Sequence, residues 1–412
     1  MTPSQPRPVS RFLDRSTPPH IVTLVVIAGL SALAMNIFLP SLPGMTEWFH
    51  TDYRLMQLSV SLYLGMSAVL QVAIGPISDR YGRRPVLLWS VALFLLATLG
   101  TLLARDVTVF LAFRMMQAVI ATGMVLSRAA IRDMVPAAEA ASMIGYVTMG
   151  MSLVPMIGPA IGGVLDQAFG WQANFALLLA LGALSFWLIW ADLGETFTPR
   201  SDGFAGQFRQ YPELLASPRF WGYSLTAAFS SGSFFAYLGG APFVGSEIYH
   251  LPPGVLGIYF AAPAFGYAFG NYASGRWSVQ LGIDRMVLAG TLITMTGLGV
   301  LLLAELAGLS GKNLFFGMII SVGLGNGLTL PNANAGLLSV RPELAGTASG
   351  LGGAIMIGGG AALAALAGWA LGFGGGALPL ILLMASSSLL AILMILLVIR
   401  RARRLGLGFD QA

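Results

Sequence analysis

The chain has 412 residues, of which 56% are hydrophobic and only 9% are charged, with a net charge of +5 and no cysteine. Soluble domains carry about 25% charged residues, so this composition cannot cover a water-facing surface and excludes soluble enzymes, nucleic-acid-binding proteins and disordered scaffolds. The absence of cysteine excludes disulfides and cysteine-ligated metals. The chain is therefore predicted to be a polytopic membrane protein.

Twelve apolar runs follow one another, each close to the roughly 20 residues that a membrane-spanning helix needs. Six precede the longest polar stretch, near 21–43, 55–77, 86–104, 107–131, 142–167 and 171–191. Six follow it, near 219–243, 252–277, 285–306, 312–338, 346–371 and 376–399. We expect the first span to be retained, since no small-residue cleavage site follows it.

These runs predict an all-α integral membrane protein with two six-helix bundles. The expected divisions are a tail (1–20), an N-terminal bundle (21–191), a central loop (192–218), a C-terminal bundle (219–399) and a second tail (400–412). The segment 132–145 resembles 341–353, and a fainter echo links 78–86 to 275–287. An internal repeat of this kind predicts two pseudo-symmetric halves.

The cations indicate the orientation in the membrane. Lys and Arg concentrate in cytoplasmic loops, and 18 of the 22 cations fall in the tails and the loops on their side if both termini are cytoplasmic. Only Arg54, Arg105 and Lys312 then lie outside, and Arg114 lies within a span. We therefore expect a multi-pass protein of the bacterial inner membrane with both termini in the cytoplasm.

The sharpest local pattern is GPISDRYGRRP over 75–85, after the second span. It predicts a tight turn in which Gly75 and Gly82 supply backbone freedom, with one acid and three arginines at the membrane face. Further patterns are FLPSLP over 38–43, AFRMMQ over 112–117, SRAAIRD over 127–133 and VPMIGPAIGG over 154–163.

Together these segments resemble the bicyclomycin/chloramphenicol resistance branch of the twelve-span drug:proton antiporters, within the major facilitator superfamily. The resemblance is dense over residues 30–175 and rests on layout beyond them. It implies a major facilitator fold and export of amphipathic small molecules, such as antibiotics, by alternating access. It also implies a transporter and not an enzyme, a proton as the coupling ion, and no other cofactor, metal or nucleic-acid partner. We expect a monomer in the lipid bilayer.

The resemblance assigns roles to two groups of residues. In the first, the side chains of Asp79, Arg83 and Asp133 resemble the charges that latch the cytoplasmic ends of spans two, four and eleven in the outward-open state. The whole latch comprises Gly75, Asp79, Arg80, Gly82, Arg83, Arg84, Arg132 and Asp133. The second group, which is expected to kink span five and pack it closely, comprises Pro155, Gly158, Pro159, Gly162 and Gly163.

Arg114 is the main candidate for the substrate and coupling site. It lies about 10 Å into the fourth span at 1.5 Å per residue, and a guanidinium at that depth usually marks a pathway. The alternative is that it reaches back to the outer interface. The substrate and coupling residues are expected to be Arg114, Asn36, Gln117, Phe38, Tyr63, Phe235, Tyr237 and Asn332, in a cavity that also holds Gln71, Phe234, Tyr259, Asn326 and Asn334.

Asn36 departs from the family pattern, in which an acid precedes the L-P-x-L-P stretch of the first span. An amide cannot take up a proton, so Asp133, Asp166 or Glu305 would have to carry it. The alternative function is an uncoupled or differently coupled carrier of an anionic or neutral metabolite, such as a siderophore or organic acid. A transport-inactive sensor is a further alternative.

Overall fold

The structure is a computed structural model of the whole chain, and it describes residues 10–134, 143, 154, 157–196, 211–309, 311–341 and 345–404. All regular elements within these ranges are helices, as the composition predicts. Nine helical segments among them are long and apolar enough to cross a membrane. The chain is therefore an all-α membrane protein.

The helices of the first half fall where the apolar runs predict them. They are α1 (Ile21–Asn36), the 3₁₀ turn η1 (Leu39–Ser41), α2 (Leu42–Trp48), α3 (Tyr53–Tyr81), α4 (Arg83–Leu103), α5 (Val107–Gln117), the 3₁₀ turn η2 (Ala118–Ala121), α6 (Thr122–Met134) and α8 (Gln172–Asp192). Residues 157–169 are also helical and form the last part of the predicted fifth span.

The second half begins after the polar stretch. Its elements are α10 (Tyr211–Leu215), α11 (Pro218–Phe243), the π-helical turn η3 (Val244–Ile248), α12 (Pro253–Phe260), α13 (Ala262–Leu281), α14 (Ile283–Leu306), α15 (Lys312–Met318), α16 (Ile320–Ser339), α17 (Ala345–Leu371) and α18 (Leu378–Arg404).

The first span is broken, which its apolar length alone does not predict. The α1 helix ends at Asn36, and the chain continues through η1 to α2. Pro40 and Pro43 lie in these short elements. A proline lacks the N–H that continues a helix and clashes with the preceding turn. The expected span 21–43 therefore extends to Trp48, with an interruption about two thirds of the way along its length.

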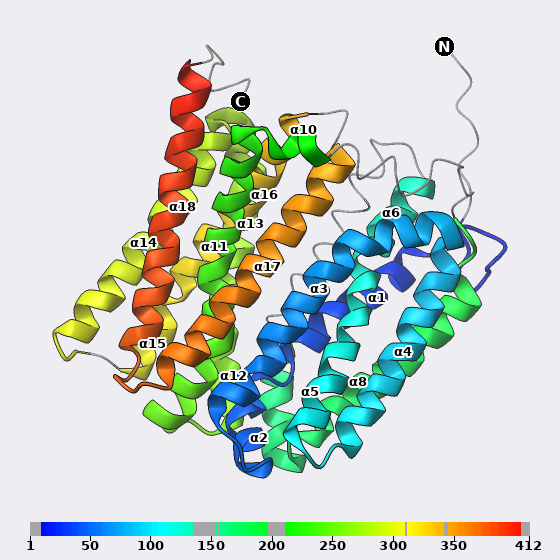
Figure 1. Cartoon of the computed structure of the whole chain (residues 1–412), viewed down its shortest axis with the longest axis horizontal. Helices are drawn as coiled ribbons and strands as arrows, with labels where there is room; N and C mark the ends of the chain where they lie inside the picture. The colour runs from blue at the N-terminus through cyan, green and yellow to red at the C-terminus, as the bar shows by residue number, and fades with distance from the viewer. Residues whose placement is uncertain are drawn as a thin grey trace.

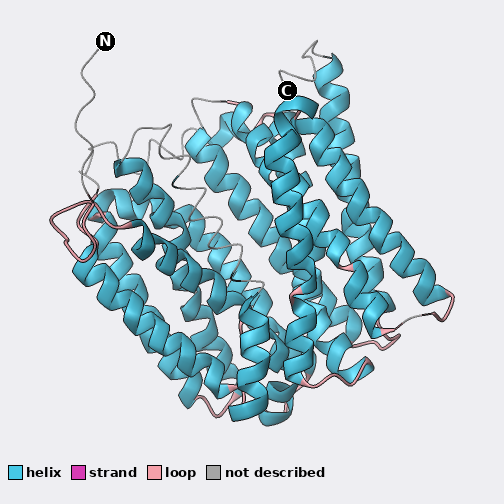
Figure 2. Ribbon diagram, turned by 180° about the vertical axis from the view of Figure 1, so that it is seen from behind, coloured by secondary structure: helices cyan, strands magenta, loops and turns pink. Residues whose placement is uncertain are grey.

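The helices form two groups that lie side by side (Figure 1). Helices α1–α8 make one group and α11–α18 the other, with α3 and α17 next to one another at their junction. We call the end where α18 finishes and α3 meets α4 the terminal end, and the opposite end, where α2 meets α3, the distal end. The two groups diverge toward the terminal end, as the reverse view in Figure 2 also shows.

Two hydrogen bonds join the halves near the distal end. The hydroxyl of Tyr53 donates a 2.9 Å hydrogen bond to the carbonyl oxygen of Gly239. The side-chain amide of Gln57 donates to the carbonyl oxygen of Ala364 at 2.5 Å. Both bonds join α3 to the second half. The halves are therefore held together at the end farthest from the chain termini.

Candidate functional site

Arg114 is buried in the first half and does not reach the outer interface. Only 1% of its surface is exposed. Its guanidinium donates hydrogen bonds to the carbonyl oxygens of Ala34 (2.8 Å) and Ser59 (3.2 Å) and to the side-chain oxygen of Gln117 (2.9 Å). One cation therefore ties α5 to α1 and α3, and the alternative of a side chain extended to the interface is wrong.

Two aromatic rings enclose the same guanidinium. Its central carbon lies 4.3 Å from the centroid of the Phe38 ring and 4.0 Å from that of Tyr63. Cation–π contacts of this kind strengthen when they are desolvated. Four of the predicted residues thus lie together: Arg114, Phe38, Tyr63 and Gln117. The side-chain amide of Gln117 also donates a 2.8 Å hydrogen bond to the hydroxyl of Thr98.

Carbonyl groups and aromatic rings hold this cation, and no carboxylate among the described residues pairs with it. Asn36 lies one turn of α1 from Ala32, whose carbonyl oxygen accepts a 3.0 Å hydrogen bond from the Asn36 amide. The side-chain oxygen of Asn36 is buried with no hydrogen-bond partner within the described ranges. The first-span position where the family pattern has an acid therefore holds a buried amide, and neutral groups hold the Arg114 cation.

A cavity of about 240 Å³ lies between the two halves. Ser231 is about 20 Å along α11 from its start at 1.5 Å per residue, and Tyr267 is equally far along the chain from the start of α12, so the cavity lies near mid-depth. Its lining residues are Ala32, Met35, Met124, Arg128, Ser231, Phe234, Phe235, Phe260, Pro263, Ala264, Tyr267, Gly323, Asn326, Leu330 and Met356.

The cavity includes only part of the predicted set. Phe235, Phe234 and Asn326 line it, whereas Arg114 and its partners form a separate closed cluster. Arg128 also lines the cavity, although the charge pattern of the sequence indicates only a cytoplasmic cation there. Its spacing of 14 residues from Arg114 along the same predicted span was the available signal.

Two predicted residues pack inside the second half. Asn332 does not line the cavity: its amide donates to the hydroxyl of Ser274 at 2.8 Å and so joins α16 to α13. Tyr237 is fully buried, its ring 5.2 Å from that of Phe260. Asn332 was predicted to face the cavity because a buried amide needs a partner, and its partner is the neighbouring helix.

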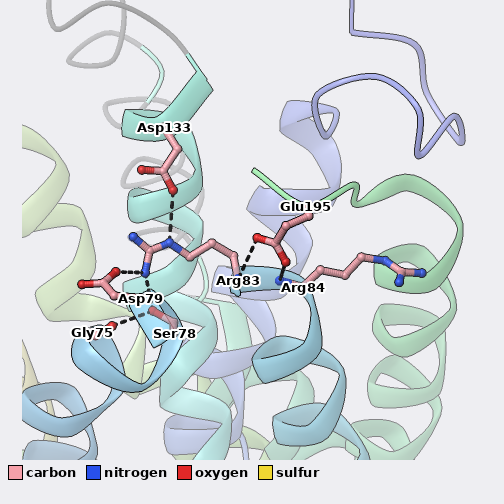
Figure 3. Close-up of polar contacts among 7 residues, drawn as sticks. All are labelled: Gly75, Ser78, Asp79, Arg83, Arg84, Asp133 and Glu195. Atoms are coloured by element: carbon pink, nitrogen blue, oxygen red, sulfur yellow. Dashed lines mark hydrogen bonds and ion pairs between the residues drawn. The ribbon is translucent and has the colours of Figure 1, made fainter. Parts of the chain in front are cut away.

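The predicted latch residues meet at the terminal end (Figure 3). Arg83 forms ion pairs with Asp79 at 2.5 Å and with Asp133 at 3.1 Å, and its guanidinium also bonds to the hydroxyl of Ser78. These contacts join α3, α4 and α6 within the first half. A network of opposite charges at a membrane surface fixes how helix ends dock.

Glu195 belongs to the same cluster, although sequence reasoning missed it. Its carboxylate accepts hydrogen bonds from the backbone N–H groups of Arg83 (2.9 Å) and Arg84 (3.3 Å). An anion at this position is favourable, because the first N–H groups of a helix have no partner within the helix. Glu195 stands 112 residues after Arg83 in the chain, so no local pattern connects the two.

The two glycines of the predicted turn behave differently. Gly82 has a φ of 91° and makes the turn between α3 and α4. Gly75 lies inside α3, where its carbonyl oxygen accepts a 2.8 Å hydrogen bond from the hydroxyl of Ser78. The prediction of a turn at Gly75 is therefore wrong, because α3 continues unbroken for six further residues to Tyr81.

The remaining latch residues are less closely engaged. Arg80 is exposed, with its guanidinium 5.4 Å from the ring centroid of Tyr81. Arg84 donates to the backbone oxygen of Trp190 at 3.1 Å. Arg132 lies on α6, but its side chain is outside what the structure describes. These residues are placed at the terminal end, and their part in a latch remains a prediction.

The predicted kink motif brings helix backbones together, and Pro155 of that motif lies outside the described residues. A side chain on Gly162 would overlap the carbonyl oxygen of Ile37, and one on Gly163 would overlap that of Pro253. A methyl group on Gly158 would lie 3.0 Å from a side-chain carbon of Leu33, which is closer than an ordinary van der Waals contact. The helix over 157–169 therefore packs against the end of α1 at Gly162 and against the second half at Gly163.

The contact with α12 is reciprocal. A side chain on Gly257 would overlap the carbonyl oxygen of Pro159. Glycines on both helices thus allow the backbones to touch, as small residues do at membrane helix interfaces. The motif closes the distal end between the two halves.

The sequence of the chain is similar to those of known membrane transporters. A family model described as the Major Facilitator Superfamily matches residues 24–365. The chain is 30% identical over 326 residues to a chloramphenicol resistance protein of Pseudomonas aeruginosa, covering 77% of this chain and 76% of that one. It is 28% identical over 370 residues to multidrug resistance protein D of Escherichia coli, covering 88% and 91%.

A solved structure shares the architecture. It is the crystal structure of a bacterial homolog of the human lysosomal transporter Spinster, in an inward-facing and occupied conformation, with a TM-score of 0.66. The sequence identity is 17%, and the alignment covers 93% of this chain and 94% of that one. This likeness concerns the fold alone.

Proposed function

Since the chain belongs to the major facilitator superfamily, we propose that it exports amphipathic small molecules, antibiotics among them, across the bacterial inner membrane by alternating access. The single observation that carries this proposal is the cavity at mid-depth between the halves. The names of the related resistance proteins support the choice of substrates. One chain supplies both walls of the cavity, so a monomer is a sufficient transport unit.

The cavity wall suits an amphipathic organic molecule. Phe234, Phe235 and Tyr267 offer aromatic surface, and methionines such as Met124 and Met356 adapt to ligands of different shape. Arg128 and Asn326 supply a few polar groups among these apolar residues. Sites of this kind bind by apolar contact and use sparse hydrogen bonds for orientation.

We further propose that the terminal end faces the cytoplasm, and the distribution of arginines supports this orientation under the positive-inside rule. The cavity would then be reached from the cytoplasm, because the halves meet at the distal end and diverge toward the terminal end. This arrangement corresponds to an inward-open state, in which a transporter that exports drugs takes up its substrate.

Proton antiport is the proposed driving force, although Asn36 cannot carry the proton. Asp133 is engaged by Arg83 at the terminal end. Asp166 is half-buried, and Glu305, also half-buried, has one buried carboxylate oxygen without a hydrogen-bond partner among the described residues. Because of this unpartnered buried oxygen, Glu305 is the acid that takes the place of the first-span acid in this proposal.

The test is proton release from everted membrane vesicles that hold an acid interior, followed with a pH-sensitive dye. Amphenicols, quinolones and lipophilic cations are added in turn. A substrate-dependent collapse of the gradient, absent from vesicles without the protein, is expected. Failure of every compound to collapse the gradient or to accumulate in the vesicles would contradict drug export.

A second candidate is a carrier of anionic or neutral molecules that is not coupled to protons. It is favoured by the cavity wall, where Arg128 is the one charged side chain among the described lining residues. Three compounds built on one aromatic scaffold, with a carboxylate, a methyl ester or a quaternary ammonium group, separate the two candidates. Flux of the carboxylate compound that follows its own gradient, with no change in vesicle pH, would favour the uncoupled carrier.

A further inference from the structure

A groove of about 580 Å³ lies at the terminal end of the second half, where α11 begins and α18 ends. Four arginines line it: Arg219 of α11 and Arg400, Arg401 and Arg404 of α18. None of its lining residues belongs to the cavity between the halves. The groove is thus a separate site. Its cations come from the first and the last helix of the second half, α11 and α18.

One wall of the groove is apolar and runs along the helices into the membrane-spanning part. It includes Leu225 about two turns inside α11, together with Met394 and Leu397 of α18. Trp221 lies near the start of α11 and donates its indole N–H to the carbonyl oxygen of Leu215 at 2.8 Å. Tryptophan is enriched at the level of lipid headgroups, which places the arginines at that level and the leucines below it.

Arg219 lacks hydrogen-bond partners for part of its guanidinium. Its Nε and one Nη are buried and unpaired within the described residues. The side chain is near Tyr223 and Asp284, whose hydroxyl and carboxylate are bonded to each other at 2.7 Å. The Tyr223 hydroxyl shares a hydrogen bond with Arg219 and the Asp284 carboxylate attracts it, so these two residues hold the guanidinium at this end of the groove.

We propose that this groove binds an anionic phospholipid. The phosphate lies among the four arginines, and an acyl chain extends along the wall formed by Leu225, Met394 and Leu397. Guanidinium groups bind phosphate through charge-assisted hydrogen bonds, and basic pockets between membrane helices bind the headgroups of anionic lipids. The start of α11 adds the positive end of a helix dipole.

The two kinds of wall distinguish a phospholipid from other anions. The preference of arginine for cytoplasmic ends explains why cations occur here, but it does not require a continuous apolar wall beneath them. A free phosphate would use the arginines alone. A phospholipid uses both surfaces, and it lies in the bilayer that surrounds this helix pair.

The experiment uses the purified full-length protein in a neutral detergent. Phosphatidylglycerol, phosphatidylcholine or inorganic phosphate is added, and the thermal unfolding midpoint is measured, with native mass spectrometry to count retained lipids. We expect phosphatidylglycerol to raise the midpoint by about 3 °C and to remain bound as one equivalent. Phosphatidylcholine should do neither.

The test variant is Arg400→Gln with Arg404→Gln, which removes two cations of the groove at exposed positions. It should lose most of the phosphatidylglycerol shift and the retained lipid. The matched control, Arg105→Gln with Lys312→Gln, removes two exposed cations at the distal end and should keep both. If the test variant does not fold, Arg401→Gln and mass spectrometry provide the same comparison.

Three results would overturn the proposal. One is an equal shift with inorganic phosphate, which would make the groove a small-anion site. Another is an equal shift with phosphatidylcholine, which would remove the role of charge. The third is full retention of phosphatidylglycerol by the test variant, which would place the lipid elsewhere. None of these results depends on which compounds the protein transports.

Discussion

Gly82 and Gly282, which stand 200 residues apart, adopt the same backbone conformation and make the same hydrogen bond. Their φ values are 91° and 83°, with ψ of 154° and 151°. Each donates its N–H at 2.9 Å to a serine carbonyl four residues earlier, Ser78 and Ser278. Only glycine adopts this region of φ and ψ readily, so the two halves turn between helices in the same way.

The same interval relates two histidines at the distal end. His50 and His250 have φ of 49° and 50°, which is uncommon outside glycine. Each precedes a helix of its half, α3 or α12. The internal repeat is therefore evident in backbone geometry at both ends of the molecule.

We predict different effects of alanine at Gly82, in the turn between α3 and α4, and at Gly75, inside α3. Gly82→Ala should lower the free energy of unfolding by about 1–3 kcal/mol because of its backbone conformation, and its methyl group would displace Glu195. Gly75→Ala should be neutral or stabilising by up to about 1 kcal/mol, because it is helical and faces open space. Thermal unfolding in detergent measures both, and equal effects would contradict this account.

Replacing Arg114 should affect stability as well as transport. Arg114→Ala removes three hydrogen bonds and leaves a cavity between the rings of Phe38 and Tyr63. We expect a loss of roughly 2–5 kcal/mol in the free energy of unfolding. Arg114→Lys keeps the charge without the planar fork and should recover part of this loss.

Vesicle transport and thermal unfolding should be measured on the same Arg114 preparations. Arg105→Ala, an exposed cation near the start of the same span, is the control and should change neither. Transport at the wild-type rate by a folded Arg114→Ala protein would remove this side chain from the mechanism and leave it a purely structural role.

Asn36→Asp should change the pH dependence of transport if the first span still lies on a coupling route. A carboxyl group at this position can exchange a proton, which the amide cannot. Asn36→Leu removes the amide without adding a titratable group, so it separates the effect of charge from that of packing. A pH profile of Asn36→Asp that matches the wild type would argue against a route through this position.

Asp106 should contribute stability that depends on pH outside the membrane. Hydrogen bonds from the backbone N–H groups of Thr108 (2.8 Å) and Val109 (3.3 Å) at the start of α5 lower the pKa of its carboxyl. Because the folded-state pKa is depressed, this contribution is present above the unfolded pKa near 4 and is lost as the pH falls through the folded value.

The measurement for Asp106 is the unfolding midpoint as a function of pH. Asp106→Ala should unfold at a lower temperature than the wild type at pH 7, and the difference should shrink as the pH falls below about 4. Asp106→Asn keeps a hydrogen-bond acceptor without the charge and should depend less on pH. A constant difference between wild type and Asp106→Ala across this range would contradict the assignment.

The fold was predictable because the membrane imposes a simple rule on the sequence. Backbone groups within lipid must bond to one another, so apolar runs of sufficient length become helices. The predicted ends differ from the observed ones by a few residues, as at Tyr53–Tyr81 against 55–77. The length of the apolar run does not predict the break after Asn36. The signal for the break is the pair of prolines that follows, Pro40 and Pro43.

The site was less predictable, because side chains from distant helices form it. Arg114 and Phe38 were expected in one cavity, but the carbonyl partners of Arg114 depend on how α1, α3 and α5 pack. Asn332 has a polar side chain of the kind that binds ligands, but its amide hydrogen-bonds to Ser274 of the neighbouring helix. Glu195 had no signal at all, since its partners are backbone N–H groups of a remote helix.

The closure at the distal end consists largely of uncharged contacts. Backbone atoms meet at Gly163 and Gly257, and neutral hydrogen bonds run from Tyr53 and Gln57. The terminal end instead holds the ion pairs of Arg83. Salt screens charged contacts according to their exposure and has little effect on uncharged packing. The carboxylates paired with Arg83 are partly exposed. If the terminal end faces the cytoplasm, as we propose, ionic strength there would act on these pairs, while the closure at the distal end would be insensitive to salt.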